Sequence, residues 1–173
     1  MISDCLLLLD GGAETTRTVI ARSMLNLSED KNQWNLLKTG IDLDTVVEEF
    51  IRFVTPIHNM CRVATEDYSI GGETIKKGQQ VLLMYSSANR DPSKFDNPEE
   101  LDLTRAPNHH IAFGFGTHFC LGAALARLEI KIFFEQLRER VKEFSIASEP
   151  IEMPNAFVYG LASCPMVLES ENT

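Results

Sequence analysis

A single cysteine, Cys120, stands between glycines and phenylalanines in the segment AFGFGTHFCLGAALARLE, residues 112–129, and an apolar helical pattern follows it at once. Metals bind the thiolate form of cysteine, which the helix dipole and the free amides of a first turn favour at a helix N-terminus. Glycines let the backbone turn tightly or approach a flat ligand, and phenylalanines supply an apolar wall. The segment therefore predicts a shielded, hydrogen-bonded thiolate. The framing residues are Phe113, Gly114, Gly116, Phe119 and Gly122.

Three alternative roles for Cys120 fit the segment less well. A cysteine that only fills a core before an amphipathic helix needs neither the glycines nor the phenylalanines. A zinc site could recruit His109, His110 and His118, but the chain has no C-x-x-C pair of the kind that marks structural zinc. A cysteine-phosphatase loop requires a shorter spacing than the one between Cys120 and Arg127.

Composition narrows the class of protein and its setting. The 173 residues, 44% of them hydrophobic, suffice for one domain. The formal net charge of −9 argues against a general nucleic-acid or anionic-membrane surface and favours small molecules or protein partners. Four distant cysteines and no secretory signal predict a reducing, cytoplasmic setting. The longest strongly apolar run, residues 5–9, is far short of the roughly 20 residues of a membrane-spanning helix, so no membrane anchor is expected.

Periodicity predicts a mainly helical chain with small sheets. The expected helices are residues 2–27, 42–54 and 121–141. Strands are expected on both sides of a Gly71-Gly72 hairpin turn, over residues 81–85 and in the tail after Pro150, with an irregular segment over residues 90–116. Within the first helix, the paired glycines Gly11 and Gly12 each cost about 1 kcal/mol relative to alanine, and such a cost calls for a functional reason.

The cysteine segment resembles the haem-binding loop of the cytochrome P-450 superfamily, whose pattern F-x-x-G-x-x-x-C-x-G is matched by Phe113, Gly116, Cys120 and Gly122. By this resemblance Cys120 is the axial thiolate of the iron of haem b, a ligand that favours O–O cleavage. Cofactor-binding roles are implied for Phe113, Gly114, His118, Cys120 and Gly122. The implied fold is the C-terminal part of the family fold: oxygen-binding helix, E-x-x-R helix, meander, cysteine loop and proximal helix.

The stretch GGAETT, which contains Gly11, Gly12, Glu14 and Thr15, resembles the oxygen-binding helix motif of the same family. The resemblance implies a local helix distortion that makes room for O2. It also implies that Glu14 and Thr15 are catalytic, because their carboxylate and hydroxyl would organise the waters that deliver protons.

A third motif, EEFIR, places Glu49 and Arg52 three residues apart on one helix face and resembles the E-x-x-R signature. Arg105 in DLTRAPN matches the third member of that structural triad. Arg62 and His118 resemble the positions that donate hydrogen bonds to the haem propionates. His58, His109 and His110 have no comparable match and are expected to be structural or exposed.

Monooxygenation is the reaction that the resemblance implies: a substrate C–H bond and O2, with two electrons and two protons, give an alcohol and water. Electrons would come from NAD(P)H through a ferredoxin reductase and a ferredoxin or flavodoxin-type protein. Arg127 and Lys131 are candidate docking contacts for that partner. A haem-thiolate sensor or a peroxide-using enzyme remains an alternative, since either would keep Cys120 with less need of Glu14 and Thr15.

The expected substrate is a hydrophobic small molecule. TPIHNMCRVATED, SANRDPSKFDNP and NHHIAFGFGTHFCLG resemble actinobacterial members that hydroxylate the terminal methyl carbon, C26 or C27, of sterol side chains such as those of cholesterol and cholestenone. Ordinary packing would account for the substrate candidates equally well residue by residue. They are Ile57, Asn59, Met60, Val158 and Tyr159.

Nothing in the sequence resembles the N-terminal part of a complete family member. Residues 1–173 are therefore expected to form a single partial domain. A truncated, catalytically silent haem-thiolate fragment is the corresponding alternative.

Overall fold

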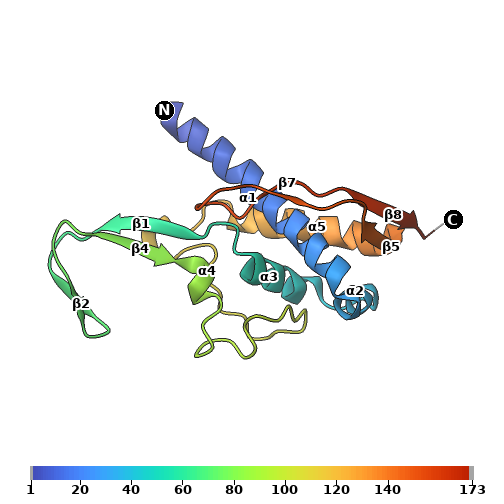
Figure 1. The fold of residues 1–173 in the computed structure, drawn as a ribbon, viewed down its shortest axis with the longest axis horizontal. Coiled ribbons are helices and arrows are strands. Elements are labelled where there is room, and N and C mark those ends of the chain that lie inside the picture. Colours follow the sequence, from blue (N-terminus) through green and yellow to red (C-terminus); the bar gives the residue numbers. More distant parts are fainter. Residues whose placement is uncertain (1, 172–173) are drawn as a thin grey trace.

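The computed structural model describes residues 2–171, which form five α-helices, one short 3-10 helix and eight strands. The predicted class, mainly helical with small sheets, is confirmed. Three long helices pack against one another and carry the core (Figure 1). They are α1 (Ile2–Glu29), α3 (Leu43–Val54) and α5 (Ala123–Arg140).

The three predicted helices are confirmed to within two residues at each end. Helix α3 begins where expected because the Asp42 carboxylate caps it, accepting hydrogen bonds from the N–H groups of Asp44 and Thr45. Two short helices, α2 (Lys31–Lys38) and α4 (Tyr85–Ala88), are not among the predicted elements. Helix α2 has its own cap, Asp30, and buries Trp34 and Leu37.

The described residues also form four two-stranded antiparallel sheets. The predicted hairpin turn at Gly71 and Gly72 is confirmed between β2 (Tyr68–Ile70) and β3 (Glu73–Ile75). The strand predicted over residues 81–85 is β4 (Gln80–Met84), which pairs with β1 (Asn59–Val63). In the tail, β5 (Val141–Ile146) pairs with β8 (Met166–Ser170), and β6 (Ile151–Glu152) pairs with β7 (Leu161–Ser163).

One hydrophobic core joins the helices to β5. Phe50 of α3 stacks on Phe134 of α5 with ring centroids 4.4 Å apart, and Trp34 of α2 meets Phe144 of β5 edge to face at 4.9 Å. This packing fixes α3 beside α5. The loop that precedes α5 is thereby held against one side of the core.

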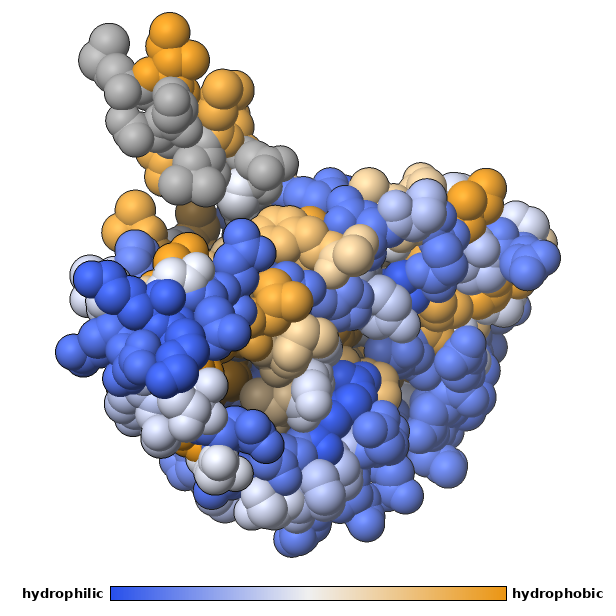
Figure 2. Space-filling view, turned by 60° about the vertical axis from the view of Figure 1, so that its left-hand side comes forward, coloured by the Kyte–Doolittle hydropathy of each residue, from blue (hydrophilic) through white to orange (hydrophobic). Residues whose placement is uncertain are grey.

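Two helices expose apolar side chains. Helix α1 projects beyond the core at its N-terminal end (Figure 1), and Figure 2 shows apolar residues on that end and in a recess beneath it. Exposed apolar surface of this extent marks a contact with other polypeptide or ligand. The exposed side chains include Ile2, Leu6, Leu8 and Leu9 of α1 and Leu125, Leu128 and Ile132 of α5. Among residues 2–171, no helix is both long and apolar enough to cross a membrane.

Candidate functional site

Two glycines in the left-handed region fold the cysteine loop back on itself. Gly114 has a φ of 72° and Gly116 a φ of 71°, values that side-chain-bearing residues rarely adopt. The turn brings the Cys120 N–H to 2.9 Å from the Phe113 carbonyl oxygen, which accepts its hydrogen bond. The backbone around Cys120 is therefore fixed by the loop itself.

Gly122 has a different reason to be glycine. Its φ of −87° suits any residue, and a Cβ added to it would meet no protein atom within 4 Å. Gly122 caps α5, which begins at Ala123, so that Cys120 lies just before the helix. The open space over Gly122 suits the close approach of a flat ligand.

Apolar side chains face solvent around the half-buried Cys120. Phe115 and Leu121 are each 90% exposed, and Phe119 is 52% exposed. Exposed aromatic and aliphatic groups beside a free thiol form the wall that a large apolar ring with a metal at its centre requires. These residues fit a haem.

Two exposed side chains, Arg62 and His118, can donate hydrogen bonds to an anionic group. Arg62 belongs to β1 and is exposed, and within residues 2–171 no carboxylate pairs with its guanidinium, which donates a hydrogen bond to the Cys61 carbonyl oxygen at 2.9 Å. His118 ends the short 3-10 helix Gly116–His118 and is also exposed. Both side chains can donate to the carboxylates of a haem.

The structure brings Glu49, Arg52 and Arg105 together. Arg52 donates to both carboxylate oxygens of Glu49, at 2.7 and 2.8 Å, and neither side chain is exposed. Arg105 donates to the same oxygens at 3.1 and 3.2 Å. Arg52 also donates to carbonyl oxygens of Asn89, Pro98 and Glu100, so the triad ties the irregular segment to α3.

Helix α1 carries Glu14 and Thr15 on a half-buried turn. The Thr15 hydroxyl donates to the Gly11 carbonyl oxygen at 2.8 Å, and the Glu14 carboxylate pairs with Arg17. The expected local distortion does not interrupt α1, which is continuous from Ile2 to Glu29. Glycine permits such a distortion, and the Thr15 hydroxyl bonds the Gly11 carbonyl oxygen within the continuous helix.

Alanine at Gly11 is expected to raise the free energy of unfolding by about 0.5–1 kcal/mol, because glycine is costly inside a helix. A Cβ added there would meet no atom within 4 Å. Urea denaturation of Gly11→Ala measures the change. The matched control, Gly114→Ala, places a Cβ at a φ of 72° and should destabilise the chain. Destabilisation by Gly11→Ala would show that packing inside the protein requires this glycine.

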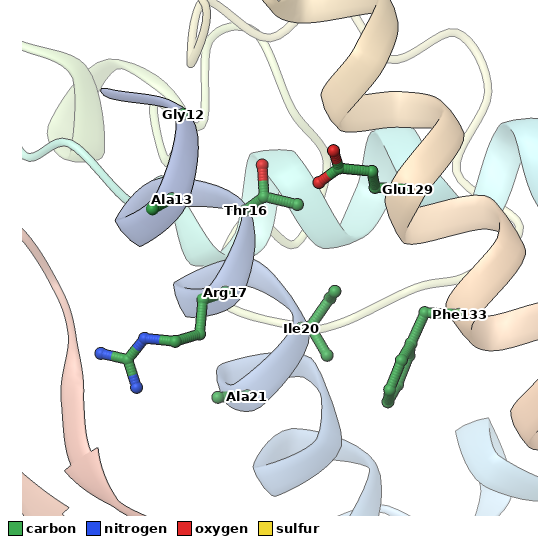
Figure 3. A pocket seen from close by; sticks show the side chains of 8 residues that line it. All are labelled: Gly12, Ala13, Thr16, Arg17, Ile20, Ala21, Glu129 and Phe133. Carbon is green, nitrogen blue, oxygen red and sulfur yellow. The ribbon is translucent and has the colours of Figure 1, made fainter. Parts of the chain in front are cut away.

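An open cleft of about 390 Å³ lies between α1 and α5 (Figure 3). Thr16 and Ile20 of α1 point toward Glu129 and Phe133 of α5 across it. The cleft borders Gly12 but not Cys120. It is a groove between two helices, separate from the cysteine loop.

The structure also brings the two segments of substrate candidates together. Ile57 forms a β-bridge with Val158, and the Asn59 side-chain amide donates to the Ala156 carbonyl oxygen at 3.0 Å. The Tyr159 N–H donates to the Pro56 carbonyl oxygen at 2.9 Å. Met60 lies apart from this contact, in β1, where it pairs with Leu83 of β4.

Sequence reasoning missed Arg22, which holds the second of these segments. Its guanidinium lies 3.5 Å from the centroid of the Tyr159 ring, donates to the carbonyl oxygens of Tyr159 and Gly160, and pairs with Glu152. The residue is only 4% exposed. A lone charge in the apolar helical stretch TVIARSML was the available signal, since a buried charge needs a partner.

A second missed group surrounds Glu48 of α3. Its carboxylate accepts from Arg127 of α5 at 2.5 and 2.9 Å and contacts His110 Nε2 at 3.0 Å. Lys131, the other candidate docking cation, pairs with Asp44. Both predicted docking cations are thus engaged by carboxylates of α3.

Comparisons with known proteins agree on one family. The sequence model of the cytochrome P-450 family matches residues 28–161. Steroid C26-monooxygenase from Mycolicibacterium smegmatis is 39% identical over 170 residues, 96% of this chain and 42% of that protein. Linalool 8-monooxygenase from Pseudomonas putida is 39% identical over 168 residues, 96% of this chain and 41% of that protein. The crystal structure of CYP109E1 from Bacillus megaterium with testosterone matches 98% of this chain and 48% of its own, at 35% identity and a TM-score of 0.91. The chain spans less than half the length of each of these relatives.

Proposed function

The chain belongs to the cytochrome P-450 family, and from this premise we propose that it is part of a haem-thiolate monooxygenase that inserts one oxygen atom of O2 into a C–H bond of a hydrophobic substrate. The observation that carries the proposal is the half-buried Cys120 thiol in a glycine-turned loop lined by exposed apolar side chains. When bound, the haem supplies the activation of O2.

The loop residues hold and shield the cofactor. Cys120 Sγ binds the iron, and the Phe113 carbonyl keeps the Cys120 amide in place. Phe119 and Leu121 exclude water from the thiolate, and Gly122 leaves room for the porphyrin. Arg62 and His118 bind the propionates by charge-assisted hydrogen bonds.

Residues of α1 handle the protons. The Thr15 hydroxyl donates to the Gly11 carbonyl oxygen, so its own oxygen is free to accept a hydrogen bond from a water molecule. The Glu14 carboxylate, fixed by Arg17, orients further waters. Together they deliver the two protons that reduction of one oxygen atom to water consumes.

The remaining part of the family fold completes the domain. The described residues expose apolar faces on α1 and α5, and the relatives are more than twice as long as the segment they share with this chain. The rest of such a fold covers these faces and closes the substrate pocket. In the complete cytoplasmic enzyme, electrons come from NAD(P)H through a ferredoxin reductase and a ferredoxin.

A sterol side chain, oxidised at its terminal methyl carbon, is the substrate that we favour. The name of the mycobacterial relative supports it, and the two bridged segments that contain Ile57, Val158 and Tyr159 carry apolar side chains. The linalool relative is equally identical at 39%, so a substrate screen must include a terpene alcohol beside cholestenone.

The carbon monoxide difference spectrum of the reduced, haem-reconstituted protein tests the function. We expect the red-shifted Soret band of thiolate ligation in the 173-residue chain or in a version completed with the remaining part of the fold. Cys120→Ser should abolish the band, whereas the matched control Cys164→Ser should keep it. A band only in the completed version would make these residues dependent on the rest of the domain. Its absence from both would refute the haem-thiolate function.

A further inference from the structure

Glu48 joins the two sides of the cysteine loop. His110 lies before Cys120 in the chain and Arg127 lies after it, and both contact the one Glu48 carboxylate. Arg127 binds it with two nitrogens, Nε and Nη2, in the bidentate arrangement that fixes both groups in one plane. These three side chains, Glu48, His110 and Arg127, form the Glu48 cluster.

Hydrogen bonds set the tautomer of His110. The Ala112 N–H donates to His110 Nδ1 at 3.3 Å, so Nδ1 is the acceptor. The neutral ring then carries its proton on Nε2 and donates it to Glu48 Oε2, 3.0 Å away. Only 2% of the His110 side chain is exposed, so little water competes for either bond.

Two side chains of the Glu48 cluster pack near the ring of Phe113. The Arg127 guanidinium lies 4.5 Å from the centroid of the Phe113 ring, within cation–π range. The His110 ring lies 5.9 Å and the Phe119 ring 6.2 Å from the same centroid. Because the Phe113 carbonyl accepts the Cys120 N–H, a chain of contacts runs from Glu48 to the cysteine.

We infer that Glu48, His110 and Arg127 are positioning residues for Cys120, which act by fixing Phe113 and, through its carbonyl, the backbone of the thiol. The inference rests on the proposed haem-thiolate function. Glu49 serves a different segment, because its bonds go to Arg52, Arg105, Asn108 and the Asp102 N–H. Glu49 therefore binds residues 102–108 of the irregular segment, whereas Glu48 binds His110 and Arg127 on either side of Cys120.

Electrostatics keep the Glu48 cluster assembled at neutral pH. Burial alone would raise the pKa of Glu48, but hydrogen bonds from His110 and Arg127, with the charge of Arg127, outweigh it and lower the pKa from 4.5 to about 2. The carboxylate therefore stays ionised far below neutral pH.

Alkylation of Cys120 by iodoacetamide tests the inference without haem. The parent carries serine at Cys5, Cys61 and Cys164, so that only Cys120 reacts. Glu48→Gln removes the charge of the cluster. Arg127→Lys keeps a cation but loses the planar fork and its stacking on Phe113. Asp44→Asn is the matched control, since it breaks the other α3–α5 ion pair, between Asp44 and Lys131 at 2.6 Å.

We expect Glu48→Gln and Arg127→Lys to raise the alkylation rate of folded protein by about tenfold or more over Asp44→Asn, because the loop opens locally more often. Urea denaturation of each variant separates this local effect from global unfolding. Rates equal to or below that of the Asp44→Asn control would overturn the inference. If Glu48→Gln does not fold, Arg127→Lys alone decides.

A second measurement uses the haem-loaded, completed protein. Glu48→Gln and Arg127→Lys should shift the reduction midpoint of the iron, and Asp44→Asn should match the parent. If the parent shows the thiolate band but both variants keep its reduction midpoint, the inference is contradicted and the proposed function stays intact. A parent without that band contradicts the proposed function, and the alkylation result still stands.

Discussion

Glu49→Ala is expected to lower the free energy of unfolding by about 3–5 kcal/mol, the usual cost of removing one partner from a buried ion pair. Neither Glu49 nor Arg52 has exposed side-chain surface. The substitution strands the charges of Arg52 and Arg105 and leaves the Asn108 amide and the Asp102 N–H without their acceptor. Small proteins are stable by about 5–15 kcal/mol, so the loss is a large share of the total.

Urea denaturation followed by circular dichroism measures the Glu49→Ala loss. Glu99→Ala is the matched control, because it makes the same change in an ion pair with Arg90 whose carboxylate is 75% exposed. Exposed pairs contribute about 1 kcal/mol or less, so the control should unfold close to the parent. Equal losses in the two variants would show that the triad does not hold the irregular segment.

Arg22→Met is expected to lower the free energy of unfolding by about 2–3 kcal/mol, the cost of stranding buried acceptors of a charged donor. The carbonyl oxygens of Tyr159 and Gly160 lose their donor, and the Tyr159 ring loses its stacked guanidinium. The ion pair with Glu152 adds little, because that carboxylate is 60% exposed. The segment around Tyr159 should therefore loosen from α1.

Hydrogen exchange of the Tyr159 amide, which donates to the Pro56 carbonyl, reports on this segment directly. Exchange should accelerate in Arg22→Met and stay near the parent rate in Lys31→Met, the matched control, whose half-exposed side chain bonds Glu143 and the Phe144 carbonyl oxygen instead of this segment. If the Tyr159 amide exchanges at the parent rate in Arg22→Met, Arg22 does not hold the segment around Tyr159 against α1.

Much of the fold is predictable because local chemistry determines it. Caps, turn glycines and helical periodicity mark α3, the β2–β3 hairpin and α5. The strand β5 is not predictable in this way, and helical periodicity wrongly extends α5 to its first residue, Val141. The buried residues Val141 and Phe144 lie three apart, as in a helix, and only pairing with β8, distant in sequence, makes the segment a strand.

Candidate site residues, too, are predictable only where local sequence marks them. Cys120 and its glycines stand out within one short segment, and Glu49 with Arg52 within one helix turn. The Glu48 cluster is invisible in the sequence, because His110 and Arg127 lie far along the chain from Glu48 and nothing local marks them as partners. Arg105 is found only through the resemblance to a family, since no spacing rule links it to Glu49.

Helix α1 has a mechanical consequence. A continuous helix of 28 residues is a stiff rod roughly 42 Å long at about 1.5 Å per residue. Thr15 and Arg22 lie two turns apart on it, so the hydroxyl that we propose handles protons and the guanidinium that contacts Tyr159 belong to one rigid body. A force applied to the projecting end of α1 would move both together, with their spacing unchanged.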